Sequence, residues 1–463
     1  MGNRKLVVVS NRGPLRAERR GKKRVWVRSA GGLVTALDPV LRARGGVWIS
    51  AEEAEDHVAY VEGAKLDYAA EPVKLKKDLQ EGFYQGVSNA VLWPLLHSFP
   101  PTIRIGTAPW DTYVAANKAF AKAALKASRP KDLVWVHDYH LLLVPGMVRE
   151  KRATARIGWF CHIPWPNPDL FGILPWRRQI LEGLLGASVL GFHTDLYARN
   201  FLQCCEQFAG LTVDWDRRAI RVGDHWRHAV TAPIGTPVEH LEELSVDSEV
   251  QAQAAALQSS VGGRTIILGV DRLDYTKGIP ERILAYEQFL KDAPAAVNNA
   301  VLVQVMVPSR TDVEAYAKLK AEVDRLVGSI NGRYGKTGQV PIHYIYRNLD
   351  QRTLFAHYVA ARVALVTPLR DGMNLVAHEY CLARGNDDGV LVLSEFAGAA
   401  ESLTDAILVN PYDMRSTAEA IDYARRLELR TQRRRMRALR NAARKLDVHR
   451  WADSYLKLLE SEH

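Results

Sequence analysis

The chain contains few cysteines and no long apolar run, and these two shortages narrow its class at once. Its 463 residues include four cysteines, whose spacing matches neither a zinc site nor a disulfide framework. No apolar stretch reaches the roughly 18 residues that a membrane-spanning helix needs. The sequence passes from Lys5 straight into an apolar segment, without the regions of a signal peptide. We therefore expect a cytoplasmic protein that holds no metal and does not enter a membrane.

Acidic residues are also in short supply, because 52 Asp and Glu oppose 62 Lys and Arg and leave a net charge of +10. Such an excess favours anionic partners, among them phosphorylated small molecules and nucleic acids. Much of it lies between Arg425 and Arg450, where no aromatic residue or known nucleic-acid module accompanies the arginines. This pattern is more typical of a solvated helix face, so we do not expect a nucleic acid as the partner.

Short β-branched runs alternate with amphipathic segments of helix length along the whole chain. Runs that are apolar throughout and separated by helices are typical of parallel, doubly wound sheets. At this length, with 47% hydrophobic residues, two such sheets with separate cores are expected. The predicted strands are LVVVS, DLVWVHD, RIGWFCHI, VLGFH, TIILGVD, VLVQVMV, IHYIY, VALVTP and GVLVLS.

The alternation lapses between Thr231 and Gly263, where prolines and glycines precede a helical stretch. We place the domain boundary in this region. The prediction is an N-terminal Rossmann-like domain over 1–240 and a second one over 241–448. A last helix, 449–463, is expected to cross back to the first domain.

Polar residues follow several of the predicted strands directly. Ligands of open α/β sheets bind beyond the carboxyl ends of the strands, so these side chains predict one cleft between the two domains. The residues concerned are Arg12, Asp138, His140, His162, Arg272, Lys277, Ser309 and Arg310.

The stretch ARVALVTPLRDGMNLVAHEYCLAR carries the strongest signal. A buried strand ends at Thr367-Pro368, a turn containing glycine follows, and a helix is predicted from about Leu375. The free amides and positive dipole of a helix start bind phosphate. Glu379, one turn further on, can accept from two ribose hydroxyls, and Asp371 in the turn can accept from those of a sugar. Together these groups predict a sugar-nucleotide site.

A second loop, GVDRLDYTKGIPER, places Arg272 and Lys277 between a strand that ends at Val270 and a helix that begins near Pro280. Two fixed cations there would stabilise a diphosphate leaving group as its charge develops. The alternative is a surface ion pair with a neighbouring carboxylate, from Asp271, Asp274 or Glu281.

Other patterns are less specific. The Gly31-Gly32 pair before a helix lacks the full G-x-G-x-x-G fingerprint. The histidines of HDYH and FCHIPWP suit either a core or a site, as do the aromatic residues Tyr84 and Trp93. Asp214-Trp215-Asp216 matches a metal-binding D-x-D only by chance, since it lies in a polar, hairpin-like stretch.

Taken together, the motifs resemble the trehalose-6-phosphate synthases, which are retaining glycosyltransferases of the GT-B fold. The resemblance runs from about residue 5 to residue 460. The motifs that carry it are SNRGP, SAGG, SNAVLWPLLH, HDYH, HIPWP, DRLDYTKG, PSR, INGRYG and LRDGMNLVAHEY.

The resemblance implies a role for each matched residue, and it implies no metal or other cofactor. The nucleotide diphosphate would be held by Gly31, Gly32, Arg272, Lys277, Leu375, Val376 and Glu379. The donor glucose would be held by His162, Asp371, Met373 and Asn374. Glucose 6-phosphate would be held by Arg12, Tyr84, Asp138 and Arg310, with Trp93 lining the pocket. The catalytic group would be His162, Arg272, Lys277 and Asp371.

The implied reaction moves glucose from a nucleoside diphosphate, expected to be UDP, to glucose 6-phosphate with retention of configuration. The departing phosphate would take the proton of the acceptor. Two alternatives stay open: a related transferase with another acceptor, such as glycerol 3-phosphate, and a catalytically idle sensor of sugar phosphates. Uracil and guanine both remain open as the base, and an assembly of identical chains is neither predicted nor excluded.

One residue departs from the family pattern. His378 stands where lysine is common in DGMNLVAHEY. The ordinary pKa of histidine is near about 6.5, and a nearby diphosphate would raise it and hold the ring protonated.

Overall fold

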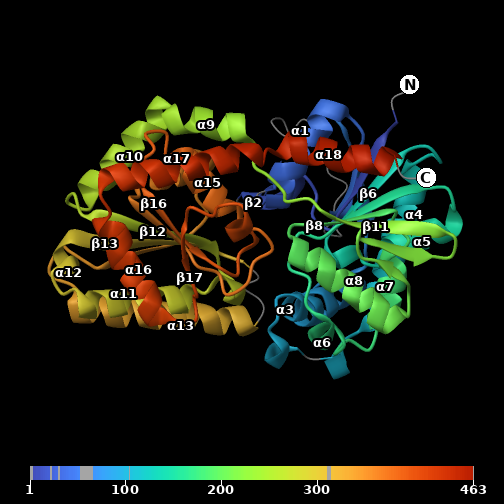
Figure 1. Ribbon diagram of the computed structural model, residues 1–463, viewed down its shortest axis with the longest axis horizontal. Coiled ribbons are helices and arrows are strands. Elements are labelled where there is room, and N and C mark those ends of the chain that lie inside the picture. The colour runs from blue at the N-terminus through green and yellow to red at the C-terminus, as the bar shows by residue number, and fades with distance from the viewer. Residues whose placement is uncertain are drawn as a thin grey trace. The chain divides into compact units, whose positions relative to one another are not determined.

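Parallel sheets with helices on both faces organise the chain (Figure 1). The computed structural model describes residues 4–20, 23–29, 32–52, 66–103, 105–309 and 314–461. It contains two units, of which unit 1 is Met1–Ile234 with Val448–His463 and unit 2 is Gly235–Asp447. Within the described ranges no helix has both the length and the apolar character needed to span a membrane.

The sheet of unit 1 has the strand order β5-β4-β1-β6-β7-β8-β11-β10-β9, and its strands are parallel from β5 to β11. The chain adds strands on one side of β1 and then returns to place β6 on the other side. The strands are β1 (Leu6–Val9), β4 (Val47–Glu52), β5 (Ala69–Lys74), β6 (Leu133–His137), β7 (Arg156–Phe160), β8 (Val189–Phe192), β9 (Val213–Asp214), β10 (Ala219–Val222) and β11 (His225–Thr231). A separate hairpin consists of β2 (Leu15–Arg20) and β3 (Lys23–Arg28).

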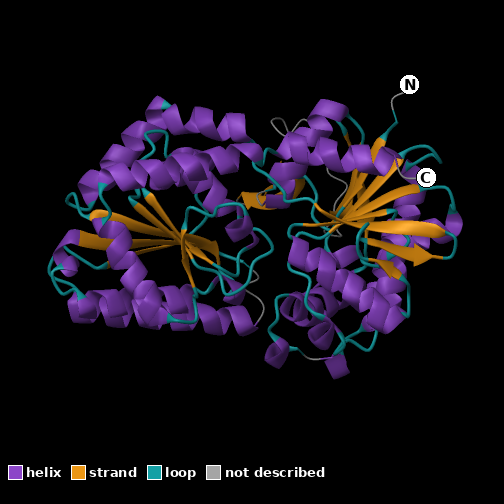
Figure 2. Cartoon of the chain, viewed as in Figure 1, coloured by secondary structure: helices purple, strands orange, loops and turns teal. Residues whose placement is uncertain are grey.

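The helices of unit 1 cover both faces of this sheet (Figure 2). One of them, η1, has π-helical hydrogen bonding. They are α1 (Gly32–Arg44), α2 (Lys77–Gln80), η1 (Glu81–Leu92), α3 (Trp93–Leu96), η2 (Pro100–Thr102), η3 (Ile105–Thr107), α4 (Trp110–Ala127), η4 (Tyr139–Leu141), α5 (Val144–Lys151), α6 (Pro168–Phe171), α7 (Arg177–Leu184), α8 (Asp195–Ala209) and α18 (Val448–Ser461).

The last helix, α18, packs on β6, β7 and β8 of unit 1. The Tyr455 ring stacks on Trp135, with ring centres 4.9 Å apart, and its hydroxyl lies within 2.9 Å of the carbonyl oxygens of Trp159 and Val189. A Cβ at Gly158 or Gly191 would come within 2.9 Å of a ring atom of Tyr455, so both positions must lack a side chain. The end of the chain is thus fixed to the sheet by a buried aromatic contact.

The sheet of unit 2 is parallel throughout, with the order β14-β13-β12-β15-β16-β17. Helices α11, α13 and α16 lie on one face, and α9, α10, α14, α15 and α17 lie on the other (Figure 1). The strands are β12 (Thr265–Arg272), β13 (Ala300–Val307), β14 (Ile342–Tyr346), β15 (Val363–Val366), β16 (Val390–Ser394) and β17 (Ile407–Val409). The helices are α9 (Val238–Val246), α10 (Ser248–Ser260), η5 (Tyr275–Lys277), α11 (Ile279–Asp292), α12 (Ala296–Asn299), α13 (Glu314–Tyr334), α14 (Gln351–Ala360), α15 (Leu375–Ala383), η6 (Gly398–Glu401), α16 (Met414–Arg426) and α17 (Leu429–Lys445).

The predicted class is confirmed, since every run predicted as a strand forms one and both sheets are doubly wound. The order of strands along the chain reverses between β1 and β6 in unit 1 and between β12 and β15 in unit 2. Such a reversal separates the loops at the carboxyl ends of the two strands and leaves a crevice between them. The residues that follow these four strands therefore lie where ligands of such sheets bind.

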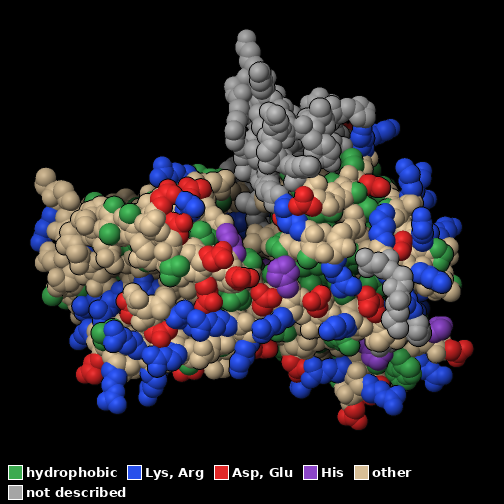
Figure 3. All heavy atoms as spheres, turned by 90° about the horizontal axis from the view of Figure 1, so that it is seen from above, with side chains coloured by type: hydrophobic (Ala, Val, Ile, Leu, Met, Phe, Trp, Pro, Cys, Tyr) green, Lys and Arg blue, Asp and Glu red, His purple; other side chains and the backbone are tan. Residues whose placement is uncertain are grey.

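The arginine-rich segment forms α17, which is amphipathic. Met436, Leu439 and Ala443 are buried, whereas Arg433 and Arg434 are exposed. Figure 3 shows one face of the molecule on which basic and acidic side chains are interspersed. A solvated helix face accounts for these arginines.

Candidate active site

The turn after β15 is fixed by the backbone that follows β16. The amide of Asp371 donates to the carbonyl of Phe396 at 3.2 Å, and the amide of Gly398 donates back to the Asp371 carbonyl at 3.2 Å. A Cβ at Gly398 would lie 2.0 Å from the carbonyl oxygen of Gly372, so this approach requires glycine. Two strand-end loops thus hold each other in place beside the β12–β15 crevice.

The predicted helix start is confirmed, since α15 begins at Leu375. Asn374 precedes it in the left-handed conformation, with φ of 75°, and its side-chain amide donates to Asp371 Oδ2 at 3.0 Å. The first amides of an α-helix have no carbonyl partner within the helix, and they carry its positive dipole. The amides of Leu375 and Val376 are therefore suited to bind an anion.

The cation of Lys277 meets the carboxylate of Asp371 across the same crevice. Lys277 ends η5, which follows β12, and its Nζ lies 2.5 Å from Asp371 Oδ2. Both side chains are mostly buried, with exposed fractions of 15% and 13%. Asp371 Oδ1 also lies 3.4 Å from the amide of Met373. The structure thus brings Lys277, Asp371, Met373 and Asn374 together from two neighbouring loops.

A buried arginine that the sequence did not single out supports these loops. Arg282 of α11 is 1% exposed and forms an ion pair with Asp271 at the end of β12. The same nitrogen, Nη1, also donates to Gln304 Oε1 at 3.2 Å. Nε donates to Thr367 Oγ1 at 3.0 Å, and Nη2 donates to the carbonyl of Lys277 at 3.3 Å. Because a buried guanidinium needs such partners, Arg282 links the end of β12, the middle of β13 and the residue that follows β15.

Arg282 also decides between the two interpretations of the loop after β12. Asp271 is occupied by Arg282, and Lys277 pairs with Asp371 rather than with a surface carboxylate. Arg272 is half-buried, and its side chain makes no hydrogen bond or ion pair with the residues that the structure describes. The surface ion pair proposed as the alternative for these two cations is not what the chain forms.

Glu379 lies one turn into α15 and has a partner that sequence reasoning missed. Its Oε2 accepts from the hydroxyl of Tyr358, on α14, at 2.9 Å. Burial raises the pKa of Glu379 above its ordinary value, and the Tyr358 hydroxyl opposes this shift. The hydrogen bond orients the carboxylate and leaves its other oxygen available to a ligand.

The ring of His378, on α15, lies in the interior of unit 2. The ring is fully buried, and burial lowers its pKa to about 4, against which the backbone of Asn374 acts only weakly. Its Nε2 lies 3.4 Å from Ser402 Oγ. An apolar interior disfavours the charged form, so the ring by itself is neutral, and its protonation by a bound diphosphate stays a prediction.

In unit 1, the loop after β1 places an arginine beside the hydroxyl of a tyrosine. The exposed Arg12 donates through Nη2 to the Tyr84 hydroxyl at 3.2 Å. The Tyr84 ring, on η1, stacks on His140 with centres 5.7 Å apart and an interplanar angle of 9°. These contacts hold a cation and an aromatic face at the carboxyl end of β1 and β6.

The loop after β6 begins with a strained residue. Asp138 has φ of 72°, which is unusual for a residue other than glycine, and its amide donates to the carbonyl of Phe160 at 2.8 Å. Trp93 is 5% exposed and packs between His97 and Tyr139, with ring centres 4.1 and 5.6 Å away. Asp138 is thus held in the loop by the backbone, and Trp93 by its neighbouring rings.

Three histidines follow one another at the ends of β6, β7 and β8. His162 Nε2 lies 3.0 Å from His137 Nδ1, and the His162 ring centre lies 5.7 Å from that of His193. Burial, and then these two neighbours, lower the pKa of His162 well below its ordinary value. The lowered pKa favours the neutral form of His162, and one of the two facing nitrogens of His162 and His137 donates to the other.

Comparison with known proteins assigns the architecture. The model of glycosyltransferase family 20 matches residues 4–461. The chain belongs to this family. It is 41% identical to a trehalose-6-phosphate synthase of Mycobacterium avium over 477 residues, which cover 99% of this chain and 96% of that one. It is 42% identical to a bifunctional trehalose-6-phosphate synthase/phosphatase of Thermoproteus tenax over 474 residues. This match covers 99% of this chain but 64% of that relative.

Solved structures of related proteins have the same fold. A trehalose-6-phosphate protein from E. coli bound with UDP-2-fluoro glucose superimposes with a TM-score of 0.90 at 33% identity, covering 99% of both chains. An α,α-trehalose-phosphate synthase (UDP-forming) from Burkholderia xenovorans, in complex with glucose-6-phosphate, superimposes with a TM-score of 0.90 at 32% identity. The match covers 99% of this chain and 100% of that one. The GT-B fold implied by the motifs is confirmed.

Not every residue named from the family motifs can be placed. Gly31 and Arg310 lie outside the described residues, and Gly32 is exposed at the start of α1. Asp214 of the D-x-D stretch accepts from the amide of Arg217 at 3.0 Å. Within the ranges that the structure describes, no cluster of three or more His, Cys, Asp or Glu has the arrangement of a metal site.

Proposed function

We propose that this member of glycosyltransferase family 20 transfers glucose from UDP-glucose to glucose 6-phosphate, giving UDP and α,α-trehalose 6-phosphate. One observation carries the proposal. At the β12–β15 crevice, Lys277, Asp371 and Asn374 form one hydrogen-bonded group directly before the amides of α15. A cation and helix-start amides suit a diphosphate, and the carboxylate suits sugar hydroxyls.

Most contacts to the donor are assigned to unit 2. Arg272, Lys277 and the amides of Leu375 and Val376 would bind the diphosphate, and Glu379 would accept from the ribose. Lys277 would leave Asp371 for the diphosphate, which frees Asp371 to accept from the glucose with Met373 and Asn374. The E. coli structure with UDP-2-fluoro glucose supports a uridine donor.

Most contacts to the acceptor are assigned to unit 1. Arg12, together with Arg310, would bind the phosphate of glucose 6-phosphate. Tyr84 and Asp138 would hydrogen-bond the sugar, and Trp93 would line its pocket. The Burkholderia xenovorans structure with glucose-6-phosphate supports this choice.

The chemistry we infer breaks the bond between glucose C1 and the diphosphate oxygen and forms one from C1 to the anomeric oxygen of glucose 6-phosphate. The acceptor proton passes to the departing phosphate on the same face, which retains the configuration. Arg272 and Lys277 stabilise the negative charge that grows on the diphosphate. His162, being neutral, contributes a hydrogen bond to the glucose rather than a charge. Gly31 and Gly32 would let the backbone approach the nucleotide.

The surroundings of the cysteines bear on where the reaction takes place. Cys161, Cys204, Cys205 and Cys381 are all free thiols and all buried. Burial raises their pKa values and makes the reactive thiolate scarce. We assign the protein to a reducing compartment, the cytoplasm.

A product assay tests the proposal. The purified chain is incubated with UDP-glucose or GDP-glucose, and with glucose 6-phosphate or glycerol 3-phosphate. We expect UDP and a non-reducing disaccharide phosphate from UDP-glucose and glucose 6-phosphate. Preference for GDP-glucose or glycerol 3-phosphate would overturn the corresponding substrate, and absence of any nucleoside diphosphate release would overturn the transferase itself.

A further inference from the structure

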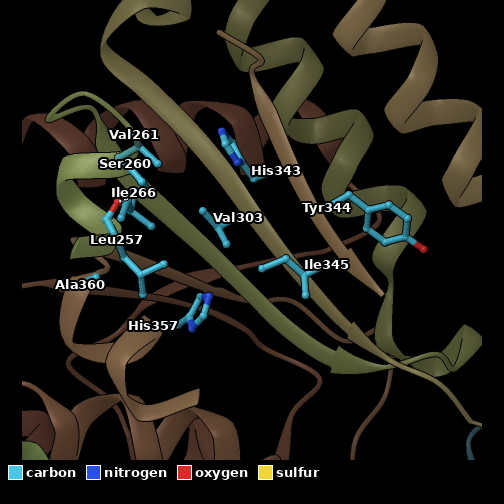
Figure 4. A pocket seen from close by; sticks show the side chains of 10 residues that line it. All are labelled: Leu257, Ser260, Val261, Ile266, Val303, His343, Tyr344, Ile345, His357 and Ala360. Atoms are coloured by element: carbon cyan, nitrogen blue, oxygen red, sulfur yellow. Dashed lines mark hydrogen bonds between the residues drawn. The ribbon is translucent and has the colours of Figure 1, made fainter. Parts of the chain in front are cut away.

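A cavity lies in unit 2 between the sheet and the helices α10 and α14. It has a volume of about 130 Å³. In Figure 4 the side chains of Leu257, Val303, Ile345 and His357 gather around one space. Ile266 adds to the apolar wall from β12. The cavity is therefore lined by three adjacent strands and two helices of the same unit.

This cavity is separate from the donor group. Ile266 is the second residue of β12, whereas Arg272 is its last. Six residues of extended strand span about 20 Å. Along the sheet the lining runs from Ile266 to Ile345, which lies level with Val270 of β12. These lining residues belong to the strands themselves, whereas Lys277 and Asp371 lie in the loops beyond the carboxyl ends of β12 and β15.

One polar atom in the wall lacks a partner. His357 is 6% exposed, and its Nδ1 lies 2.7 Å from the carbonyl oxygen of Thr353. Because a carbonyl can only accept, Nδ1 must carry the ring proton. Burial lowers the pKa of His357, which keeps the ring neutral and leaves Nε2 as an acceptor. This Nε2 is buried and has no hydrogen-bond partner within the described part of the chain.

The other polar residues of the wall do not donate a hydrogen bond to His357 Nε2. The Tyr344 ring points away from the group (Figure 4) and lies 5.7 Å from Lys320 Nζ, which belongs to α13 on the opposite face of the sheet. Ser260 donates its hydroxyl hydrogen to the carbonyl of Leu257 at 2.7 Å. Ser260 is exposed and His343 half-buried, so the cavity can be reached from solvent at this rim.

We propose that this cavity is a binding site for a small, neutral, single-ring molecule that bears one hydroxyl or N–H donor, of which phenol is the simplest example. The volume fits one ring, since an engineered protein cavity of about 150 Å³ holds benzene. The apolar walls bind the ring face and edge, and the donor meets His357 Nε2. A lone water is a poorer occupant, because an ordered water needs two to four polar partners.

The test is a titration of the whole chain with phenol and with benzene, which lacks the donor. A molecule of seven heavy atoms is expected to bind with a dissociation constant of about 1–10 mM. His357→Phe keeps a ring but removes the acceptor, so it should weaken phenol about tenfold and leave benzene unchanged or tighter. Leu257→Trp fills the cavity from its rim and should abolish binding of both molecules.

Saturating UDP serves as the control for the location. It should not displace phenol, whatever the outcome of the transferase assay. Displacement by UDP, equal effects of His357→Phe on phenol and benzene, or undiminished binding in Leu257→Trp would each overturn the site. If His357→Phe does not fold, the Leu257→Trp titration and the UDP competition still decide the matter.

Discussion

The two units contain the same type of sheet crevice but line it with different chemistry. In unit 2, the loops after β12 and β15 meet through an ion pair, Lys277 with Asp371, and through the buried guanidinium of Arg282. In unit 1, Tyr84 of η1 links the two loops: its ring stacks on His140 after β6, and its hydroxyl accepts from the exposed Arg12 after β1. The topology supplies the place for a ligand, and the loop residues decide which ligand the place accepts.

The two groups are stabilised by different interactions. Buried charges need partners, so the unit 2 group neutralises itself through hydrogen bonds among its own members. Stacked rings need no counter-charge, so the unit 1 group stays in place through packing. Substitutions in unit 2 should therefore affect charge development in the reaction, whereas those in unit 1 should affect acceptor binding.

The largest expected effect comes from Arg272, for whose side chain the described residues of unit 2 provide no hydrogen bond or ion pair. Arg272→Ala should lower kcat/KM by about 10²-fold or more, because it removes a group that stabilises the leaving diphosphate. Steady-state assays with UDP-glucose and glucose 6-phosphate measure it. Arg430→Ala, on the exposed face of α17, is the matched control and should leave turnover unchanged. Near-normal turnover in Arg272→Ala would remove the assigned role.

Acid should destabilise both units through their buried histidines. Burial lowers the pKa of His137 to about 3 and that of His378 to about 4, from ordinary values of 6.5. Below pH 6.5 the unfolded chain binds protons that the folded chain does not, so the free energy of unfolding falls as the pH drops toward 4. Each such histidine contributes about 1.4 kcal/mol per pH unit over this range.

Urea unfolding of the wild type, His137→Phe and His378→Phe between pH 7 and pH 4 measures this loss. Each variant should show a shallower dependence on pH than the wild type, because one titrating group is gone. An unchanged slope in either variant would show that the ring concerned is charged in the folded protein.

A smaller and more selective effect is expected in unit 1. Arg12→Ala should raise the KM for glucose 6-phosphate about tenfold, the usual loss for a hydrogen bond to a charged group, and should leave the KM for UDP-glucose unchanged. Kinetics with each substrate varied in turn separate the two constants. An equal rise in both constants would contradict the division of substrates between the units.

The smallest effect concerns a residue that positions another. Tyr358→Phe removes the hydroxyl that orients Glu379 and should raise the KM for UDP-glucose about threefold, with little change in kcat. Glu379→Gln, which weakens the ribose contact directly, should have the larger effect. A greater loss in Tyr358→Phe than in Glu379→Gln would show that Tyr358 acts on the ligand itself.

Features local in sequence were predictable, and features formed by distant residues were not. The helix start at Leu375 and the strand before Thr367 could be predicted because periodicity and a glycine turn are written within one short stretch. Arg282 meets Thr367, 85 residues away, and no short motif records that contact. Tyr358 was missed for the same reason.

The charge state of the His378 ring by itself could not be predicted, because its pKa depends on burial, which the motif DGMNLVAHEY does not reveal. The same holds for His162, whose pKa falls through burial and through two histidines from other strands. Sequence indicated which residue types gather at the strand ends. Their protonation states required the packed structure.

Binding of the donor diphosphate by unit 2 can be tested by calorimetric titration of UDP into the wild type, Lys277→Ala and Arg12→Ala. If the unit 2 crevice binds the diphosphate, UDP affinity falls at least about tenfold in Lys277→Ala and is unchanged in Arg12→Ala. Equal affinity in Lys277→Ala and the wild type, or a loss in Arg12→Ala alone, would contradict the account.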